Sequence, residues 1–318
     1  MDPTKVHLDT DLGGDIDDLC ALALLLKWPN VEITGITSVL EDQGKRAGYT
    51  RYAMALAGRR EVPVAAGADV RLGCYRLREY ALPLEERYWP ERVAPAPGPL
   101  DAALDLLQQS LERGAILVGV GPFTNLSLLE RRSPGVLRHA TLYLMGGSIT
   151  PAPPGFPAWD YEMDFNVQAD CRSAKHVLES ADPDRITLVP IEVTAQTALR
   201  RAHLAALRRA GPLGQLLARQ SEAFAQDERF AEHYGRRYAG LPPDIINFQH
   251  DPLTCAVALG WDGVAVEPLP LALALEDGWL RLRTHDRGRR MRVVTRIDSA
   301  KFNTFWLDTV ARDPTSPH

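Results

Sequence analysis

Short apolar segments that alternate with longer helical patterns restrict the fold of this 318-residue chain more than any other feature. Residues 115–120 are almost continuously aliphatic, which is typical of a strand buried on both faces. Strand–helix alternation predicts parallel strands joined by right-handed crossovers. We therefore expect an α/β fold with a Rossmann-like, mostly parallel central sheet flanked by helices. The expected strands are 6–8, 32–39, 62–65, 115–120, 141–145 and 186–190, and the expected helices are 16–27, 44–56, 103–112, 126–131 and 171–178.

The sequence shows no boundary between domains, although at about 150 residues per domain its length allows two. It contains no internal repeat, low-complexity tract or clear linker. Residues 200–238 have a helical, basic pattern, and residues 260–297 alternate in short runs that predict β-hairpins at an edge of the sheet. We expect a single domain over residues 1–318.

The charge balance argues against two classes of partner. Lys and Arg number 36 and Asp and Glu 41, so the net charge is −5 and gives no reason to expect binding to nucleic acid or to an anionic membrane. The apolar run 19–26 is too short to span a bilayer, and the first residues do not resemble a signal peptide. The four cysteines form no CxxC pair, so we expect neither disulfides nor a zinc site. The same cysteine usage predicts a cytoplasmic protein.

An acidic turn directly after the first expected strand carries the strongest functional signal. Five aspartates lie within ten residues, and their mutual repulsion favours a cation between them. Carboxylates without neighbouring His or Cys favour the hard cations Ca²⁺ or Mg²⁺, and the two glycines between them allow a tight turn. Helix capping is the alternative, but it accounts for one or two aspartates only. The five are Asp9, Asp11, Asp15, Asp17 and Asp18.

Three known uses of such a turn compete. An EF-hand needs Glu at the twelfth position, which is Cys20 when the count starts at Asp9. A Mg²⁺-dependent phosphatase of the haloacid dehalogenase type would use Asp9 as nucleophile and Asp11 as acid and base, but its downstream lysine and acidic pair are not evident. The third use is a metal-activated water with an aspartate base. A non-catalytic module that binds the metal for stability or for a ligand stays open beside them.

Several segments, in order and spacing, resemble the inosine–uridine-preferring nucleoside hydrolases. The acidic turn resembles the family's Asp-rich N-terminal motif, with two extra residues before the final Asp-Asp. The resemblance extends from residue 6 to about residue 258 and includes a Gly-Pro-Leu-Thr-Asn-like segment and a Met-Gly-Gly turn. Each piece is weak alone, but the ordered set is specific. The matching segments are 9–11, 17–18, 36–39, 118–125, 144–147, 164–166 and 250–251.

The resemblance implies hydrolysis of the N-glycosidic bond of a ribonucleoside, with Ca²⁺ as cofactor. It implies that Asp11 is the base that deprotonates the attacking water and that His250 is the leaving-group acid. Asp9 would support the turn from behind. It also implies a homodimer or homotetramer. The implied metal ligands are Asp11, Asp18, the carbonyl of Val120 and Asp251, and the implied substrate-binding residues are Asp17, Asp42, Met145, Asp164 and Asn166.

The chain departs from the family pattern at three places. Glu41-Asp42 stands where the family has Gly-Asn, so Asp42 would take the place of an asparagine of the site. Asp164 replaces a glutamate, and Trp159 lies where a polar residue is expected. Recognition of the 5′ side of the sugar is therefore expected to differ. We read Thr194 as structural and Asn125 as a helix cap.

Two irregular segments, 71–99 and 148–161, are either lids over a site or ordinary surface connections. Two aromatic side chains of the first segment could stack on a base, and three further residues shortly before position 250 could line the pocket for the base, but ordinary packing in the core, on the surface or within a helix accounts for them equally well. These candidates are Tyr88, Trp89, His233, Tyr234 and Tyr238.

Overall fold

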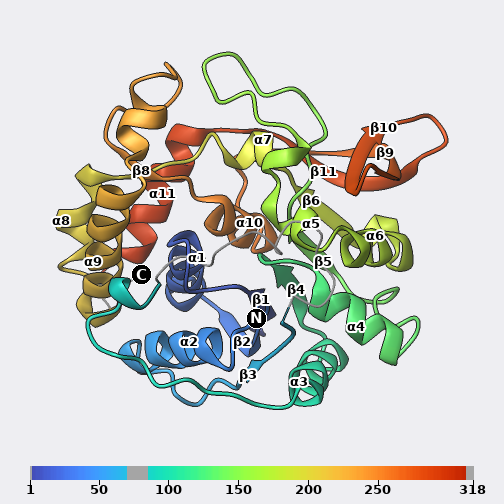
Figure 1. Ribbon diagram of the computed structural model, residues 1–318, viewed down its shortest axis with the longest axis horizontal. Coiled ribbons are helices and arrows are strands. Elements are labelled where there is room, and N and C mark those ends of the chain that lie inside the picture. The colour runs from blue at the N-terminus through green and yellow to red at the C-terminus, as the bar shows by residue number, and fades with distance from the viewer. Residues whose placement is uncertain (1, 70–84, 313–318) are drawn as a thin grey trace.

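The computed structural model describes residues 2–69 and 85–312 (Figure 1). The predicted α/β architecture is confirmed, and all six predicted strands and five predicted helices are present with small shifts at their ends. The strands are β1 (Thr4–Thr10), β2 (Val31–Ser38), β3 (Val64–Ala66), β4 (Ile116–Gly119), β5 (Leu142–Met145), β6 (Ile186–Val189), β7 (Leu199–Arg200), β8 (Ile245–Asn247), β9 (Val264–Glu276), β10 (Trp279–Thr284) and β11 (Arg289–Ile297). The helices are α1 (Asp17–Lys27), α2 (Lys45–Leu56), α3 (Leu100–Glu112), α4 (Thr124–Arg132), α5 (Phe165–Ala169), α6 (Cys171–Ser180), α7 (Ile191–Thr194), α8 (Leu204–Leu207), α9 (Gly211–Asp227), α10 (His250–Ala258) and α11 (Ser299–Val310).

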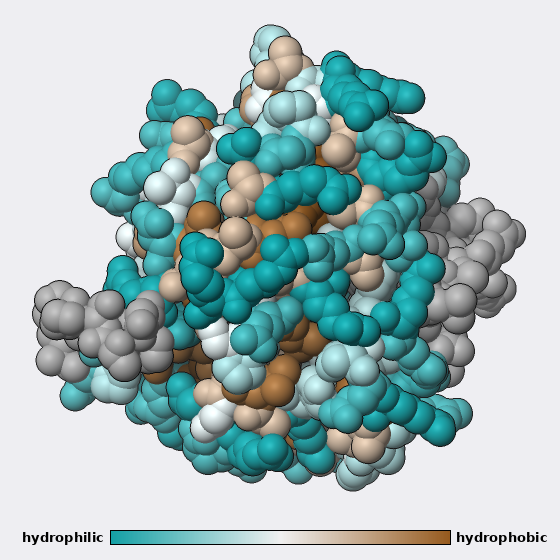
Figure 2. Space-filling view, turned by 90° about the vertical axis from the view of Figure 1, so that its left-hand side faces the viewer, coloured by the Kyte–Doolittle hydropathy of each residue, from teal (hydrophilic) through white to brown (hydrophobic). Residues whose placement is uncertain are grey.

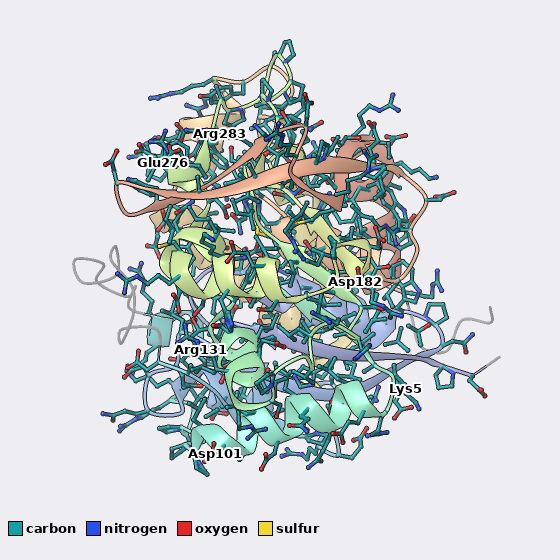
Figure 3. All side chains as sticks on the ribbon, turned by 90° about the vertical axis from the view of Figure 1, so that its right-hand side faces the viewer. Lys5, Asp101, Arg131, Asp182, Glu276 and Arg283 are labelled. Carbon is teal, nitrogen blue, oxygen red and sulfur yellow. The ribbon has the colours of Figure 1, made fainter. Side chains whose placement is uncertain are left out.

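Within the described residues, nine strands form the central sheet in the order β10-β9-β11-β6-β5-β4-β1-β2-β3. The strands from β3 to β6 pair in parallel, and β11 is parallel to β6. The predicted hairpins are confirmed at one edge, where β9 pairs antiparallel with β10 and β11. Glu276 and Arg283 form an ion pair across the β9–β10 hairpin at 2.8 Å (Figure 3).

The position of β1 in the sheet determines where a ligand binds. From β1 the chain proceeds to β2 and β3 on one side, and returns to β4, β5 and β6 on the other. The loops after β1 and β4 therefore diverge to opposite sides of the sheet. In open parallel sheets this divergence leaves a crevice outside the carboxyl ends of the two strands. The acidic turn follows β1 directly, so it lies at this crevice.

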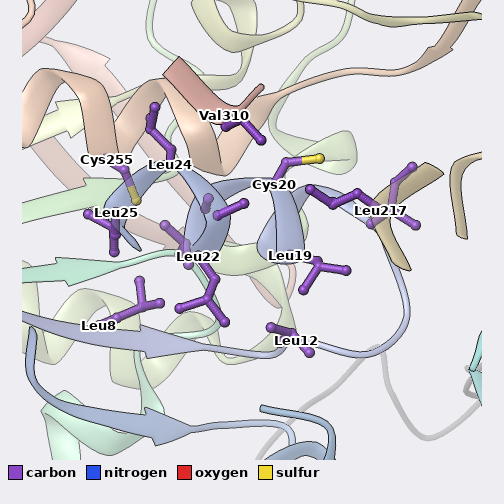
Figure 4. Close-up of a cluster of buried hydrophobic side chains, with 14 of the residues drawn as sticks. Leu8, Leu12, Leu19, Cys20, Leu22, Leu24, Leu25, Leu217, Cys255 and Val310 are labelled. Atoms are coloured by element: carbon purple, nitrogen blue, oxygen red, sulfur yellow. The ribbon is translucent and has the colours of Figure 1, made fainter. Parts of the chain in front are cut away.

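Helices cover both faces of the sheet, and α1 lies at the centre of one layer (Figure 1). Every residue from Leu19 to Leu25 is buried, so α1 is enclosed on all sides rather than amphipathic. It packs on the sheet and against α9, α10 and α11, while α3, α4 and α6 cover the opposite face. Figure 4 shows the surrounding side chains, among them Leu8, Leu217, Cys255 and Val310. This packing fixes the N-terminus of α1, where Asp17 and Asp18 are located.

The surface carries the features expected from the composition. Figure 2 shows hydrophilic side chains over most of one face, with apolar surface visible between them. Among residues 2–69 and 85–312, no helix combines the length and apolar character needed to cross a bilayer. Cys20, Cys171 and Cys255 are buried, and Cys74 lies outside the described residues.

Candidate active site

A cavity of about 300 Å³ lies at the crevice and collects most of the predicted site residues. Its walls come from the loops after β1, β4 and β5, from α1, and from the first turn of α10. The structure thus brings together residues that are distributed over nearly the whole chain. Eight of the ten predicted residues line the cavity: Asp11, Asp17, Asp18, Val120, Met145, Asn166, His250 and Asp251.

Three carboxylates form a compact cluster in this cavity. One oxygen each of Asp17, Asp18 and Asp251 lies within 4.8 Å of the other two, and all three residues are buried. Burial, and then the charges of neighbouring carboxylates, raise the pKa of each well above its usual value. Ionised together, they would repel one another strongly without a positive charge between them. The cluster consists of oxygen donors only, which suits Ca²⁺ or Mg²⁺.

Backbone geometry and hydrogen bonds hold the cluster in place. Gly13 has φ = 146°, a conformation that glycine adopts without strain and that turns the chain from β1 towards α1. The hydroxyl of Thr10 donates to Asp18. The backbone N–H of Asp251 donates to Asp17 Oδ2 over 3.4 Å, which joins the first turns of α1 and α10.

Asp11 lies on the cavity wall outside this three-residue cluster. Burial raises the pKa of its carboxyl group to about 6, and the guanidinium of Arg46 acts in the opposite direction. Arg46 is itself buried and lines the cavity. The predicted base is therefore a carboxylate with an elevated pKa beside one buried positive charge, which is typical of a residue that accepts protons near neutral pH.

The loops after β4 and β5 are joined by one amide. Asn166 Nδ2 donates to the carbonyl oxygen of Val120 at 2.8 Å and contacts Met145 Sδ at 3.1 Å. All three residues line the cavity next to the carboxylates. Asn166 thereby fixes the carbonyl that the sequence predicted as a metal ligand.

Four aromatic side chains that contact one another also line the cavity and form an aromatic wall. It consists of Trp159, Phe230, Tyr234 and Phe248. The ring of Trp159 lies 4.9 Å from Phe248 and 5.4 Å from Tyr234, both in edge-to-face geometry. This wall can bind a flat heterocycle.

The other aromatic candidates have different positions. Trp89 stacks on Tyr49 at 4.4 Å, and both Tyr88 and Trp89 are buried in the core. His233 and Tyr238 do not line the cavity, although Tyr238 packs on Tyr234. Of the two irregular segments, 148–161 supplies Trp159 to the aromatic wall, whereas residues 70–84 of the other lie outside the described residues.

Two predicted substrate-binding residues do not line the cavity. Asp42 forms an ion pair with Lys45 at 3.0 Å. Asp164 is buried, and its carboxylate accepts the backbone N–H groups of Gly147 at 2.7 Å and Val167 at 3.4 Å. Asp164 therefore holds the turn after β5 and caps α5.

The family model of the inosine-uridine preferring nucleoside hydrolases matches residues 6–304. The chain belongs to this family. An uncharacterized protein of Schizosaccharomyces pombe is 30% identical over 276 residues, covering 79% of this chain and 78% of that protein. The pyrimidine-specific ribonucleoside hydrolase RihA of Salmonella schwarzengrund is 28% identical over 267 residues, with the same shares covered.

Solved structures agree on the nucleoside hydrolase fold. A plant nucleoside hydrolase superposes with a TM-score of 0.77 at 19% identity, over 98% of this chain and 100% of that one. The purine-preferring ribonucleoside hydrolase from Gardnerella vaginalis gives a TM-score of 0.73 at 22% identity, over 97% and 98%. The family supports an enzyme that hydrolyses ribonucleosides.

The family assignment does not favour the phosphatase or the non-catalytic module. The position of Asp9 also argues against the phosphatase, because Asp9 does not line the cavity. Its Oδ1 accepts from Thr37 and, at 2.7 Å, from Asn125. Asp9 thus supports the turn from behind, as expected for a nucleoside hydrolase. The predicted capping role of Asn125 is wrong, since its side chain spans from Asp9 to the backbone of Ser38 and Ala68 instead.

Sequence reasoning missed several groups at the site. Arg46 lines the cavity, and the amide of Asn247 donates to Asp15, an aspartate of the acidic turn that also lines it. Thr194, read as structural, has its Oγ1 2.6 Å from Nδ1 of His250, the predicted acid of the nucleoside hydrolase reaction. Burial lowers the pKa of His250 to about 4. No local sequence signal marks these contacts, because each joins segments far apart in the chain.

Proposed function

We propose that this nucleoside hydrolase cleaves the N-glycosidic bond of ribonucleosides to free base and ribose, with Ca²⁺ as cofactor. The observation that carries the proposal is a cavity lined both by five aspartates and by an aromatic wall. Cleavage of such a bond develops positive charge on the sugar ring. Carboxylates stabilise that charge, and aromatic side chains bind the base.

The donor set supports a hard cation. We infer that the carboxylates of Asp11, Asp18 and Asp251 and the carbonyl of Val120 hold Ca²⁺, which takes six to eight oxygen ligands. Asp18 and Asp251 belong to the buried carboxylate cluster, and Asp11 and Val120 line the same cavity. When bound, Ca²⁺ would make a water molecule a stronger acid and would bind hydroxyl groups of the sugar.

The residues of the chain then divide the reaction between them. Asp11 takes the proton of the attacking water. Asp17 binds the 2′-hydroxyl, while Asn166 and Met145 contact the sugar from the side of β5. His250 faces the departing base. Asp164 supports the turn after β5 from outside the cavity. A contribution of Asp42 to substrate binding stays a prediction. The homodimeric or homotetrameric state and the cytoplasmic location also stay predictions.

The aromatic wall supports binding of a purine or a pyrimidine base. RihA is named as pyrimidine-specific and the Gardnerella protein as purine-preferring, so the preferred base differs between related nucleoside hydrolases. Stacking on Trp159 and Phe248 depends on a flat ring and not on one pattern of donors and acceptors. We therefore propose ribonucleosides as a class.

The test is reducing-sugar release from inosine, adenosine, guanosine, uridine and cytidine, each with Ca²⁺ and with chelator. We expect release that chelator suppresses and that Asp11→Asn lowers by about 100-fold or more. Asp101→Asn, an exposed aspartate on α3, is the matched control and should keep wild-type activity. Silence on every nucleoside, with phosphate released from phosphate esters, would refute the proposal.

A further inference from the structure

One long segment, residues 145–191, contributes a mostly apolar surface to the cavity. The segment supplies one amide, Asn166, and five apolar or aromatic side chains: Met145, Trp159, Met163, Phe165 and Ile191. The amide nitrogen of Asn166 donates to the carbonyl oxygen of Val120 at 2.8 Å. Because that carbonyl is a proposed metal ligand, Asn166 lies where the cation would bind the sugar hydroxyls. The rest of this surface offers a ligand chiefly van der Waals contact.

The stereochemistry of a ribonucleoside indicates which of its groups meets this apolar surface. The 2′- and 3′-hydroxyls lie on one face of the sugar ring, and the base and C5′ lie together on the other face. With the base at the aromatic wall, as proposed above, C5′ projects on the same side of the sugar as the wall. Trp159 belongs both to the wall and to the segment 145–191. The 5′ substituent then lies beside the next residues of this segment that line the cavity, Met163 and Phe165.

The carboxylate expected at the 5′ side does not reach a ligand in the cavity. The sequence motif predicted Asp164 for this place, but the residue is buried and does not line the cavity. Its Oδ2 accepts the N–H of Gly147 at 2.7 Å, and its Oδ1 accepts that of Val167 at 3.4 Å. The two neighbours of Asp164 line the cavity instead. A 5′-hydroxyl thus meets a thioether and a phenyl ring where a carboxylate was expected.

Met163 and Phe165, which we call the apolar pair, are accessible to a ligand. Their exposed fractions are 48% and 37%, and they are two of the four exposed large hydrophobic side chains in residues 2–69 and 85–312. Covering exposed apolar surface with an apolar group is favourable, whereas covering a hydroxyl without a hydrogen-bond partner is costly. The thioether of a methionine is also polarisable and adapts to the shape of an apolar ligand.

Contacts with the edge of the sheet hold the apolar pair in place. The one-turn helix η3 (Tyr161–Met163) lies against β10, and β10 also packs on α5, which begins at Phe165 (Figure 1). Arg281 of β10 donates to the hydroxyl of Tyr161 at 2.9 Å and lies 4.4 Å from the centre of its ring. Trp279 packs edge-on against the same ring at 5.6 Å. A surface that is already formed loses little conformational entropy when a ligand binds.

We propose that the preferred substrates are ribonucleosides with an apolar 5′ substituent, namely 5′-deoxy- and 5′-alkylthio-ribonucleosides. The apolar pair contacts the 5′ substituent and determines this specificity. The bond that breaks is still the C1′–N bond, water still supplies the new oxygen on C1′, and the products are the free base and a 5-deoxy- or 5-alkylthio-ribose. This inference rests on the proposed function and narrows its substrate class.

The first test compares substrates that differ only at the 5′ position. Adenosine, 5′-deoxyadenosine and 5′-methylthioadenosine form one series, and uridine and 5′-deoxyuridine form a second, all in the presence of Ca²⁺. We expect kcat/KM to rise by about 10-fold when the 5′-hydroxyl is removed, and by a similar factor again with the methylthio group. Equal or lower kcat/KM for the modified nucleosides would overturn the inference and leave the proposed function in place.

The second test changes the apolar pair. Met163→Gln replaces a thioether by an amide of similar length, so it should lower the kcat/KM ratio of 5′-methylthioadenosine to adenosine by about fivefold or more, mainly through KM. Leu275→Gln is the matched control, because Leu275 is an equally exposed hydrophobic residue of β9 that does not line the cavity. It should keep the wild-type ratio. An unchanged ratio in Met163→Gln would overturn the assignment of Met163 to the 5′ side.

A third variant tests the hydroxyl of Tyr234 as an alternative partner of the 5′-hydroxyl, since Tyr234 is part of the aromatic wall. We expect Tyr234→Phe to change KM for adenosine and for 5′-deoxyadenosine by the same factor. A rise in KM for adenosine alone would show that the 5′-hydroxyl has a polar partner, and would contradict the inference.

The inference and the proposed function fail in different ways. Absence of turnover of every riboside, with and without a 5′-hydroxyl, would refute the proposed function. Calorimetric titration of the wild-type protein with the same adenosine series then decides the inference. Binding of 5′-methylthioadenosine about 10-fold tighter than adenosine would support an apolar 5′ site, and equal affinities would overturn it.

Discussion

The guanidinium of Arg46 donates a hydrogen bond to the main-chain carbonyl oxygen of Asp11. Its Nε donates to the carbonyl of Leu40 at 2.8 Å, so one buried side chain joins the loops that follow β1 and β2. The carboxylate of Glu41 accepts the backbone N–H of Arg46 at 2.9 Å and secures the start of α2. Where the family pattern has Gly-Asn, this chain has Glu41, whose carboxylate accepts backbone N–H groups at the start of α2. The buried guanidinium of Arg46 lies beside it at the edge of the site.

Replacing Arg46 should shift the pH dependence of activity. Burial raises the pKa of Asp11, and the charge of Arg46 limits that rise. In Arg46→Met the pKa should increase further, so the acidic limb of the kcat/KM profile should move to higher pH by about one unit. Arg131→Met, at an exposed position of α4, is the matched control. An unchanged profile would show that Arg46 does not act on Asp11.

Gly121 should not tolerate a side chain. A Cβ there would lie 2.6 Å from Val39 Cγ1 and 2.9 Å from Asp11 Oδ1. Gly121→Ala should displace Asp11, lower kcat by at least about 10-fold and cost about 1–3 kcal/mol of stability. Gly98→Ala meets no atom within 4 Å and should behave as wild type in the same assays. Wild-type kinetics in both variants would mean that Asp11 is not placed as described.

Calcium should stabilise the folded protein through the buried carboxylates. At a hundredfold excess over Kd, binding to the native state alone adds about 2.7 kcal/mol to the free energy of unfolding. We expect calcium to raise the melting temperature and chelator to lower it. Asp251→Asn removes one member of the cluster and should abolish most of the difference. A calcium effect of full size in Asp251→Asn would exclude this residue as a ligand.

Asp164 should make stability depend on pH. Burial raises its pKa to about 7 from 3.8. At Asp164 the folded state then binds more protons than the unfolded state between these values, so the contribution of this residue to stability is fully present below pH 3.8 and is lost as the pH rises to about 7. The difference in unfolding free energy between wild type and Asp164→Asn should therefore decrease over this window, by on the order of 4 kcal/mol. Urea denaturation at pH 4 to 8 measures it, and a constant difference would contradict the elevated pKa.

Trp159 should contribute to binding more than to chemistry. It lies on the aromatic wall and touches Phe248 and Tyr234. Trp159→Ala should raise KM for nucleosides by about 10-fold, the value of one stacked ring, with a smaller effect on kcat. Trp159→Phe should recover part of the affinity. A fall in kcat at constant KM would instead assign the ring to the transition state.

The sequence predicted the sheet and the carboxylates because both leave local signals. Buried parallel strands are continuous apolar runs, and five aspartates after such a strand are visible without a structure. Topology then places the ends of β1 and β4 together, so Asp11 and Val120 had to meet.

Other parts of the site have no local signal. Arg46 is one of many basic residues in the sequence, and its burial follows only from the packing of α2. The bond between Thr194 and His250 joins residues 56 positions apart. Asp164 occupies the motif position where the family has glutamate. Its carboxylate, on a side chain shorter by one methylene, accepts hydrogen bonds from backbone N–H groups instead of lining the cavity. These contacts depend on tertiary distances of a few ångströms, which residue spacing does not fix.

The hydrogen bond between Asp251 and Asp17 joins residues 234 positions apart in the chain. Carboxylates from the two ends of the sequence therefore meet only after the whole parallel sheet and α10 have assembled, which gives the site a high contact order. During synthesis the first aspartates leave the ribosome long before their partner, so the nascent chain must bury α1 without the cation that we propose for the folded protein. High-affinity cation binding would therefore require that folding is complete. A chain truncated before residue 250 would lack Asp251, and hence the site, even if its N-terminal strands had formed.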